Sequence, residues 1–121
     1  MKIQESAENY LEAIFIIKKK KGYVRSIDIA RDLGYSKPSV SRAMKLLREH
    51  DYITVNEGGI IELTETGAQI AENMYERHTF LTQFLTRIGV PEDVAFEDAC
   101  RIEHVISQET FRRLKVFIES K

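Results

Sequence analysis

The sequence predicts a mainly α-helical fold with one small β-hairpin. We expect a winged helix-turn-helix domain over residues 1–63, followed by an α-helical dimerisation domain over residues 64–121. Three observations support this fold class. Two short stretches with helical spacing of apolar residues meet at a glycine turn, two β-rich runs ("YITV" and "IIEL") follow them, and the rest of the chain repeats apolar residues at helical spacing.

The first helix is predicted from Ser6 to about Lys20, with Gly22 ending it. Its apolar stripe consists of Tyr10, Leu11, Ile14, Phe15 and Ile17. A short second helix begins at Ser26, whose hydroxyl oxygen is expected to act as its N-cap. This helix stops at Gly34, because glycine readily adopts the left-handed conformation that terminates helices.

A third helix follows almost at once, with Ser36 as its N-cap and Pro38 in its first turn, where proline costs no hydrogen bond. Its inner face consists of Val40, Ala43, Met44 and Leu47. The next two β-rich runs are separated by "NEGG", and Gly58 and Gly59 suit a tight hairpin turn. A helix-turn-helix followed by a hairpin is typical of a winged helix, although a plain αα-hairpin with an incidental ribbon is the alternative.

Three more helices are predicted in the second half of the chain. Thr64 caps a long one that ends near Ile88, Pro91 lies in the first turn of the next, and the last begins near Ser107. Their apolar stripes include Phe80, Phe84, Phe96, Phe111 and Phe117. A domain of this size cannot cover so much apolar surface, so we expect a homodimer.

Charge is distributed unevenly along a chain whose net charge is only −1. Residues 18–48 carry ten basic and two acidic side chains, whereas residues 64–121 carry seven basic and ten acidic ones. The basic stretch suits the phosphates of double-stranded DNA. If the third helix enters the major groove, its outer side chains face the bases and phosphates; a solvated helix face is the alternative. The candidate DNA-contacting residues are Arg25, Lys37, Pro38, Ser39, Ser41, Arg42 and Lys45.

The segment "CRIEHV" holds the single cysteine of the chain. On a helix, Cys100, Glu103 and His104 share one face, and thiolate, carboxylate and imidazole are all metal ligands. A chance polar cluster is the alternative. One cysteine forms no internal disulfide, and the chain has no membrane-spanning apolar run and no secretory signal, so we expect a cytoplasmic protein without a membrane partner.

The motifs together resemble one known family. "NYLEAIF", "GYVRSIDIARDLGYSKPSVSRAMKLL", "GIIELTETGAQIA", "ERHTFLTQFL" and "IEHVIS" are similar to the DtxR/MntR family of metal-dependent transcriptional repressors over nearly the whole chain. The resemblance implies a metal-activated repressor, not an enzyme, that binds palindromic operator DNA as a homodimer and controls iron or manganese homeostasis. Larger members add an SH3-like domain, for which this chain is too short.

The resemblance also implies the metal ligands. Carried over by position, Asn9, Cys100, Glu103 and His104 form one site, while Glu12 and His78 form a second with Glu103 as a bridge. The spacing of Asn9 and Glu12, three residues apart on the first helix, allows both to face the same ligands.

The ligand set mixes two patterns within the family. Manganese-responding members usually carry aspartate and glutamate at the positions of Asn9 and Cys100, and iron-responding members carry methionine and cysteine. A thiolate with an imidazole favours softer ions, so we expect Fe(II) over Mn(II), with zinc, cobalt and nickel also accepted.

Three alternatives remain from the sequence. A metal-independent winged-helix regulator that responds to a small organic ligand would bind DNA equally well in a chelator. A protein held together by a structural zinc site would unfold when a chelator removes the zinc. An enzyme with Cys100 as nucleophile and His104 as base lacks an oxyanion loop and leaves the basic winged helix unexplained.

Overall fold

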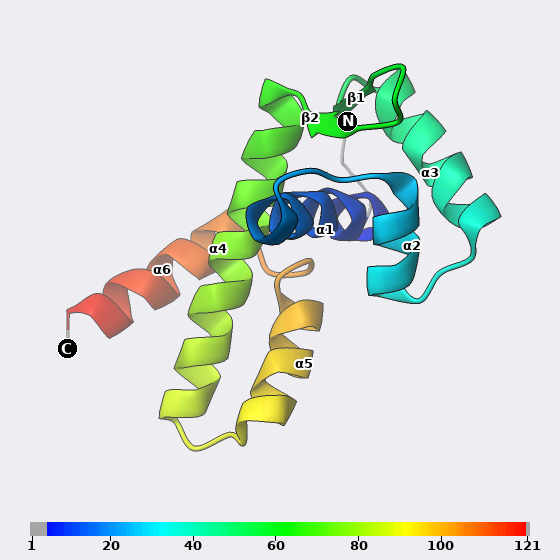
Figure 1. The fold of residues 1–121 in the computed structure, drawn as a ribbon. Helices are drawn as coiled ribbons and strands as arrows, with labels where there is room; N and C mark the ends of the chain where they lie inside the picture. The colour runs from blue at the N-terminus through cyan, green and yellow to red at the C-terminus, as the bar shows by residue number, and fades with distance from the viewer. Residues whose placement is uncertain (1–4, 121) are drawn as a thin grey trace. The chain divides into compact units, whose positions relative to one another are not determined.

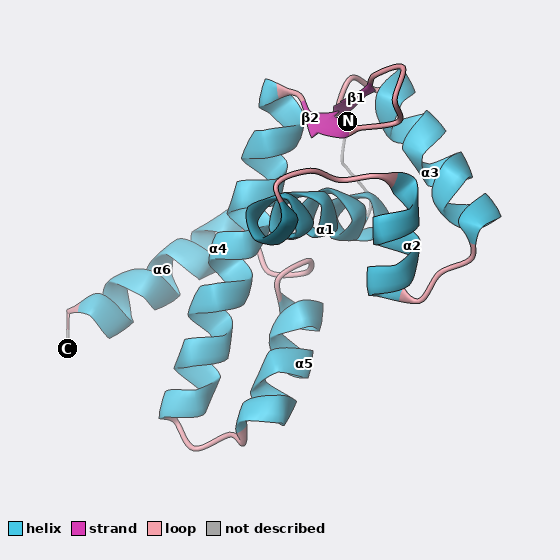
Figure 2. Cartoon of the chain, in the orientation of Figure 1, coloured by secondary structure: helices cyan, strands magenta, loops and turns pink. Residues whose placement is uncertain are grey.

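The fold, seen in a computed structural model that describes residues 5–120, is mainly helical with one two-stranded antiparallel sheet (Figure 1). The fold class predicted from the sequence is confirmed, and Figure 2 shows how little of the chain is strand. The elements in chain order are α1 (Glu5–Lys21), α2 (Ser26–Leu33), α3 (Lys37–Glu49), β1 (Ile53–Val55), β2 (Ile61–Leu63), α4 (Glu65–Arg87), α5 (Glu92–Ile102) and α6 (Gln108–Glu119).

The chain forms two compact units, and the division between them falls inside α4, between Glu72 and Asn73. The sequence places the domain boundary at residues 63 and 64, one residue before α4 begins. The difference arises because the first turns of α4 contribute Ile70 and Ala71 to the core of the first unit. The domain ranges 1–63 and 64–121 therefore stay a prediction, and residues 1–4 and 121 lie outside the described residues.

The helices of the first unit pack around α1, which contacts α2, α3 and β2. Their shared core contains Leu11, Ile14, Val24, Ile29, Val40, Met44, Leu47, Ile53 and Ile61, all at most 5% exposed. As expected, Gly34 ends α2 with a φ of 72°, and the Ser36 hydroxyl accepts a hydrogen bond from the backbone N–H of Ser39. These two caps set the tight turn of the helix-turn-helix.

The predicted N-cap of α2 is wrong by one residue. Arg25, not Ser26, occupies the N-cap position, and the carboxylate of Asp28 accepts the backbone N–H of Arg25. A buried carboxylate three positions into the helix offers a stronger acceptor than a hydroxyl, because a charge-assisted hydrogen bond is stronger than a neutral one. The same carboxylate pairs with Lys21 at the end of α1, so this cap also joins the two helices.

The wing is a short hairpin in which Ile53 pairs with Leu63 and Val55 with Ile61. Its turn closes with a backbone hydrogen bond from Gly59 to Asn56, and Gly59 has a positive φ of 83°. The backbone N–H of Ile61 donates to the carbonyl of Val24, which fixes the hairpin to the segment before α2.

The hairpin leads directly into α4. The hydroxyl of Thr64 accepts the N–H of Gly67, which confirms the predicted cap, and the backbone N–H of Thr64 donates to the carbonyl of Tyr52. Gly67 is buried against that same carbonyl, and a side-chain Cβ at position 67 would overlap its oxygen. The absence of a side chain at Gly67 therefore allows this close approach.

The second unit consists of the rest of α4 with α5 and α6. Met74, Leu81, Ala95, Ala99 and Phe111 are its buried apolar residues. Pro91 occupies the N-cap of α5, one position before the first turn in which the sequence places it. No helix within residues 5–120 is long and apolar enough to cross a membrane.

Candidate metal centre

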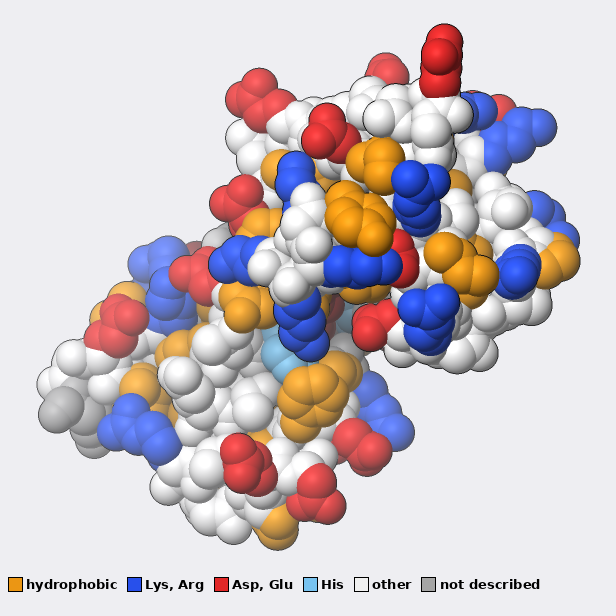
Figure 3. All heavy atoms as spheres, in the orientation of Figure 1, with side chains coloured by type: hydrophobic (Ala, Val, Ile, Leu, Met, Phe, Trp, Pro, Cys, Tyr) orange, Lys and Arg blue, Asp and Glu red, His pale blue; other side chains and the backbone are white. Residues whose placement is uncertain are grey.

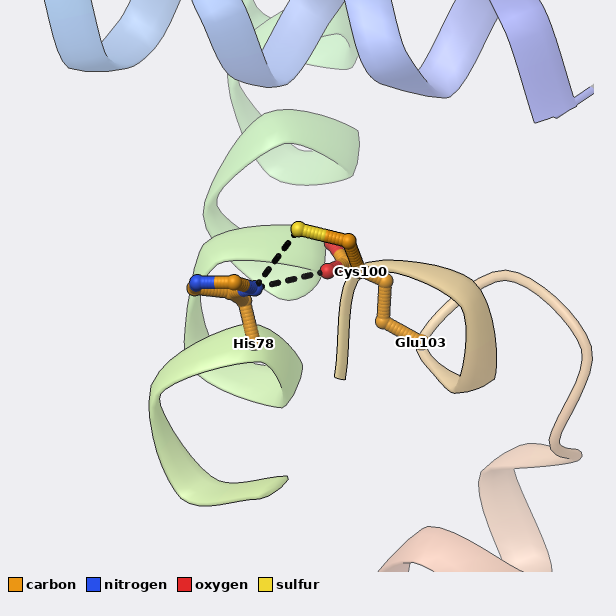
Figure 4. Close-up of side chains that lie close together, drawn as sticks. All are labelled: His78, Cys100 and Glu103. Carbon is orange, nitrogen blue, oxygen red and sulfur yellow. Dashed lines mark hydrogen bonds and ion pairs between the residues drawn. The ribbon is translucent and has the colours of Figure 1, made fainter. Parts of the chain in front are cut away.

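Three of the predicted ligands lie close together in the second unit (Figure 4). His78 is on α4, Cys100 is on α5, and Glu103 is the C-cap of α5. Nδ1 of His78 lies 2.9 Å from Oε1 of Glu103 and 3.7 Å from Sγ of Cys100. One imidazole nitrogen thus faces a carboxylate and a sulfur atom at once.

Glu103 is the most unusual residue of this cluster, because its side chain is fully buried. Its Oε1 atom contacts His78, but its Oε2 atom is buried without a hydrogen-bond partner among the described residues. A buried carboxylate oxygen that lacks a partner is costly. The arrangement therefore leaves one carboxylate oxygen available for a further cation.

Electrostatics within the cluster favour positive charge on the imidazole. Hydrogen bonds that the imidazole makes first with Cys100 and then with Glu103 raise the pKa of His78 to about 10, against the opposing effect of its partial burial. His78 also packs edge-to-face on the ring of Phe96, with 4.6 Å between centroids. The site therefore stabilises positive charge at the position of the imidazole.

The donor set fits a divalent transition metal. Two groups of possible ligand atoms occur here. In the first group, one ligand atom each of His78, Cys100 and Glu103 lies within 4.8 Å of the other two. In the second group, one ligand atom of Glu103 and one of His104 lie within 4.8 Å of each other. Nitrogen, sulfur and oxygen donors in this combination suit zinc, iron and similar ions. Glu103 is common to both groups, as a bridging residue would be.

Asn9 and Glu12 lie one turn apart on α1, in the first unit. Their role as ligands stays a prediction from their spacing and from the family resemblance.

Sequence reasoning missed Arg77, the residue immediately before His78. Its side chain is only 7% exposed, and its guanidinium donates to the carbonyl oxygens of Glu103 and Ile106 and to the side-chain carbonyl of Gln108. An arginine in an amphipathic helix usually faces solvent, so the helical spacing alone gave no signal.

The predicted DNA-contacting residues cluster on and near α3 in the first unit. Ser41, Arg42 and Lys45 are exposed on α3 while Val40, Met44 and Leu47 are buried, as the predicted helix orientation requires. Lys37 and Pro38 are exposed, and Ser39 is half-buried. Figure 3 shows Lys and Arg side chains gathered on the visible face of this unit.

Two further features define this surface. Ser26, Ile27, Lys37 and Ser41 line a shallow pocket between the beginnings of α2 and α3. The guanidinium of Arg25 donates to the carbonyl of Gly58 at the tip of the wing. Arg25 therefore contacts the wing loop directly, which the sequence did not predict.

Comparison with known proteins matches both halves of the chain. Residues 2–59 match the N-terminal DNA binding domain of the iron dependent repressors, and residues 64–120 match their metal binding and dimerisation domain. The chain is 35% identical over 109 residues to the HTH-type transcriptional regulator MntR of Geobacillus kaustophilus, covering 90% of this chain and 77% of that protein.

Solved structures show the same fold. The IdeR structure from T. acidophilum is 30% identical with a TM-score of 0.77, over 93% of this chain and 53% of that one. The manganese regulator SloR is 25% identical with a TM-score of 0.83, over 100% of this chain and 56% of that one. The chain thus spans about half the length of these two solved structures.

Proposed function

The chain belongs to the DtxR/MntR family of metal-dependent transcriptional repressors, which are DNA-binding regulators and not enzymes, and we propose that it is a metal-activated repressor. In this proposal it binds a palindromic operator as a homodimer in the cytoplasm and controls metal homeostasis. A divalent metal ion, most favourably Fe(II), is its activating ligand.

The single observation that carries the proposal is the buried carboxylate of Glu103. Its Oε2 atom has no hydrogen-bond partner within residues 5–120, and the imidazole of His78 and the thiol of Cys100 lie beside it. The three residues are less exposed to solvent than a typical cluster of polar side chains on a protein surface. Glu103 is buried, and His78 and Cys100 are half-buried. This environment favours a dehydrated cation over a hydrated one.

We propose Asn9, Cys100, Glu103 and His104 as one ligand set, and Glu12 and His78, with Glu103 shared, as the other. When bound, the ion would neutralise the anionic ligands and hold them together. Cys100 supplies a soft donor, Asn9 a neutral oxygen and His104 an imidazole. This set suits Fe(II) better than Mn(II), and zinc, cobalt and nickel are also expected to bind.

The DNA-binding part of the proposal uses the outer face of α3. Arg42 and Lys45 are exposed there, and Ser39 and Ser41 permit close approach of the helix to the bases and phosphates. Lys37 and Pro38 at the first turn of α3 and Arg25 beside the wing extend the surface. Two copies of α3 in a dimer would read two half-sites of one palindrome.

Exposed apolar side chains of the second unit support dimerisation. Phe96 and Phe117 are 54% and 57% exposed, and Val105 is 74% exposed. Several large apolar groups on the surface of so small a unit are typical of an interface.

The proposed coupling between metal and DNA runs through α1. Asn9 and Glu12 lie on α1, and the same helix contributes Leu11 and Ile14 to the core of the first unit. Ligation through α1 would restrict the orientations available to the whole winged helix and increase the fraction that fits successive major grooves. A coupling of about 1–3 kcal/mol, typical of allostery, corresponds to a roughly 5- to 150-fold gain in DNA affinity.

The test is an anaerobic titration of operator binding with Fe(II), Mn(II) and Zn(II), each compared with a chelator. Operator fragments are first selected from genomic DNA in the presence of metal. We expect binding to require metal, with Fe(II) effective at lower free concentration than Mn(II). Chelator-independent binding would favour the organic-ligand regulator, and unfolding in chelator would favour a structural site.

A further inference from the structure

We infer that Arg77 is a positioning residue for the metal ligands, a role that rests on the proposed function. Its guanidinium holds the backbone of Glu103, while the next residue along α4, His78, contacts the carboxylate of that same glutamate. Two neighbouring side chains of one helix therefore fix both the main chain and the side chain of one ligand.

The need for such a residue follows from the segment that links α5 to α6. The carbonyl groups in the last turn of α5 have backbone donors in this segment, because the N–H of Glu103 donates to Ala99 and the N–H groups of Val105 and Ile106 donate to Ile102. The carbonyl groups of the segment itself need donors from elsewhere, since a buried carbonyl group without a donor is costly. Arg77 supplies two of them, at 2.9 Å from the carbonyl oxygen of Glu103 and 2.8 Å from that of Ile106.

The second arm of the guanidinium reaches the next helix. It donates to Oε1 of Gln108, the first residue of α6, at 2.8 Å, and the guanidinium carbon lies 5.5 Å from the centre of the Phe111 ring. The planar fork of arginine presents several donors in fixed directions, so one side chain sets the distance between α4, the end of α5 and the start of α6. Lysine has no such fork.

The position of this contact within the ligand set is important. Cys100 lies inside α5, where the helix itself holds it, whereas Glu103 is the C-cap of α5 and His104 follows it. These two residues depend on the end of the helix being fixed. Arg77 is therefore expected to orient Glu103 and His104 more than Cys100, as outer partners orient metal ligands in general.

The test uses Co(II) titration of the whole chain under anaerobic conditions, with absorption spectroscopy. The thiolate-to-cobalt charge-transfer band reports Cys100, and the d–d bands report the geometry of all ligands. The variants are Arg77→Met, Arg77→Lys and Gln108→Ala. The matched control is Arg87→Met, which removes an exposed arginine from the last turn of the same helix.

We expect Arg77→Met to weaken Co(II) binding about 10- to 100-fold relative to Arg87→Met. The charge-transfer band should persist at saturation while the d–d bands change, because Cys100 keeps its place and the other ligands do not. Gln108→Ala should weaken binding less, since both carbonyl contacts of Arg77 remain. A purely structural role would lower the melting temperature and leave affinity and saturated spectrum unchanged.

A folded Arg77→Met variant with the affinity and spectrum of the control would overturn the inference. If that variant does not fold, Arg77→Lys and Gln108→Ala provide the test. The inference is then overturned if both of these variants bind Co(II) as tightly as the control. Failure of the unmodified protein to bind Co(II) at all would instead overturn the proposed function.

Discussion

Nδ1 of His78 lies 2.9 Å from Oε1 of Glu103, and the other carboxylate oxygen of Glu103 is buried with no hydrogen-bond partner in the part of the chain that the structure describes. The pair is thus only half satisfied: the imidazole stabilises one oxygen and leaves the second with its desolvation cost. Removing the charge of Glu103 would take away a ligand but leave an oxygen that can accept from His78. Helical content and metal binding should therefore respond differently.

Glu103→Gln is the first substitution that tests this relationship. The amide oxygen can still accept a hydrogen bond from His78, so we expect the helical content to be unchanged. Metal affinity should fall by at least about 100-fold, more than the loss of an outer partner costs, and metal-dependent DNA binding should disappear with it. Circular dichroism and metal titration measure both effects. Glu97→Gln, on the exposed side of α5, is the control and should change neither.

Cys100→Glu tests the proposed metal preference. Replacing a soft thiolate by a hard carboxylate should weaken binding of Zn(II) and Co(II) and increase the relative affinity for Mn(II). Competitive titrations against a chromophoric chelator measure each affinity. An unchanged order of metal affinities would show that the thiol of Cys100 is not a ligand.

Gly67→Ala should destabilise the first unit, although glycine to alanine usually stabilises a helix by up to about 1 kcal/mol. The added Cβ would overlap the carbonyl oxygen of Tyr52, which is backbone and cannot rotate away. We expect a loss of about 1–3 kcal/mol in the free energy of unfolding, as for other overpacked sites, measured by urea denaturation. Gly58→Ala, in the wing turn, meets only ordinary contact distances and should have little effect; an equal loss in both would refute the steric explanation.

Asp28 gives the protein a pH-dependent stability at acid pH. The hydrogen bond from Lys21, followed by the backbone N–H of Arg25, holds the pKa of Asp28 below its usual value despite burial. A carboxyl whose pKa is lower in the folded state stabilises the fold above its unfolded pKa, near 4, and that contribution is lost as the pH falls through the folded pKa. The difference in unfolding free energy between the parent and Asp28→Asn should therefore shrink below about pH 4. Urea denaturation at pH 7, 5, 4 and 3 measures it, and a constant difference would contradict the linkage.

Removing Arg42 and removing Arg25 should change the salt dependence of DNA binding by different amounts. Arg42 is exposed on α3, so Arg42→Ala should weaken DNA binding and reduce the slope of log affinity against log salt by about 0.9 for each phosphate that the arginine had neutralised. The guanidinium of Arg25 is occupied by the carbonyl of Gly58, so Arg25→Ala should weaken binding through the wing with a smaller change in slope. Equal slopes for the two variants would show that Arg25 contacts phosphate directly.

Local chemistry made most of the fold predictable. Ser36 and Thr64 cap their helices as expected, because each hydroxyl accepts a backbone N–H three residues along its own segment. The cap of α2 was misplaced because Asp28, three residues into the helix, takes the backbone N–H of Arg25. Burial of that carboxylate depends on Lys21 in another helix, and helical spacing within one segment does not reveal such a contact.

The candidate site was predictable only in part, for the same reason. Cys100 and Glu103 share one helix, so their spacing alone places them on one face. His78 lies 22 residues earlier in the chain than Cys100, and only the family resemblance connected the two. Arg77 was missed because its acceptors are backbone carbonyls, which carry no sequence signature.

The guanidinium of Arg77 donates to acceptors at both ends of one segment, the carbonyl of Glu103 and the side chain of Gln108. These two hydrogen bonds fix the distance between the ends of that segment. Inserting or deleting a single amino acid in that segment would shift one acceptor out of reach, so natural relatives should keep its length constant.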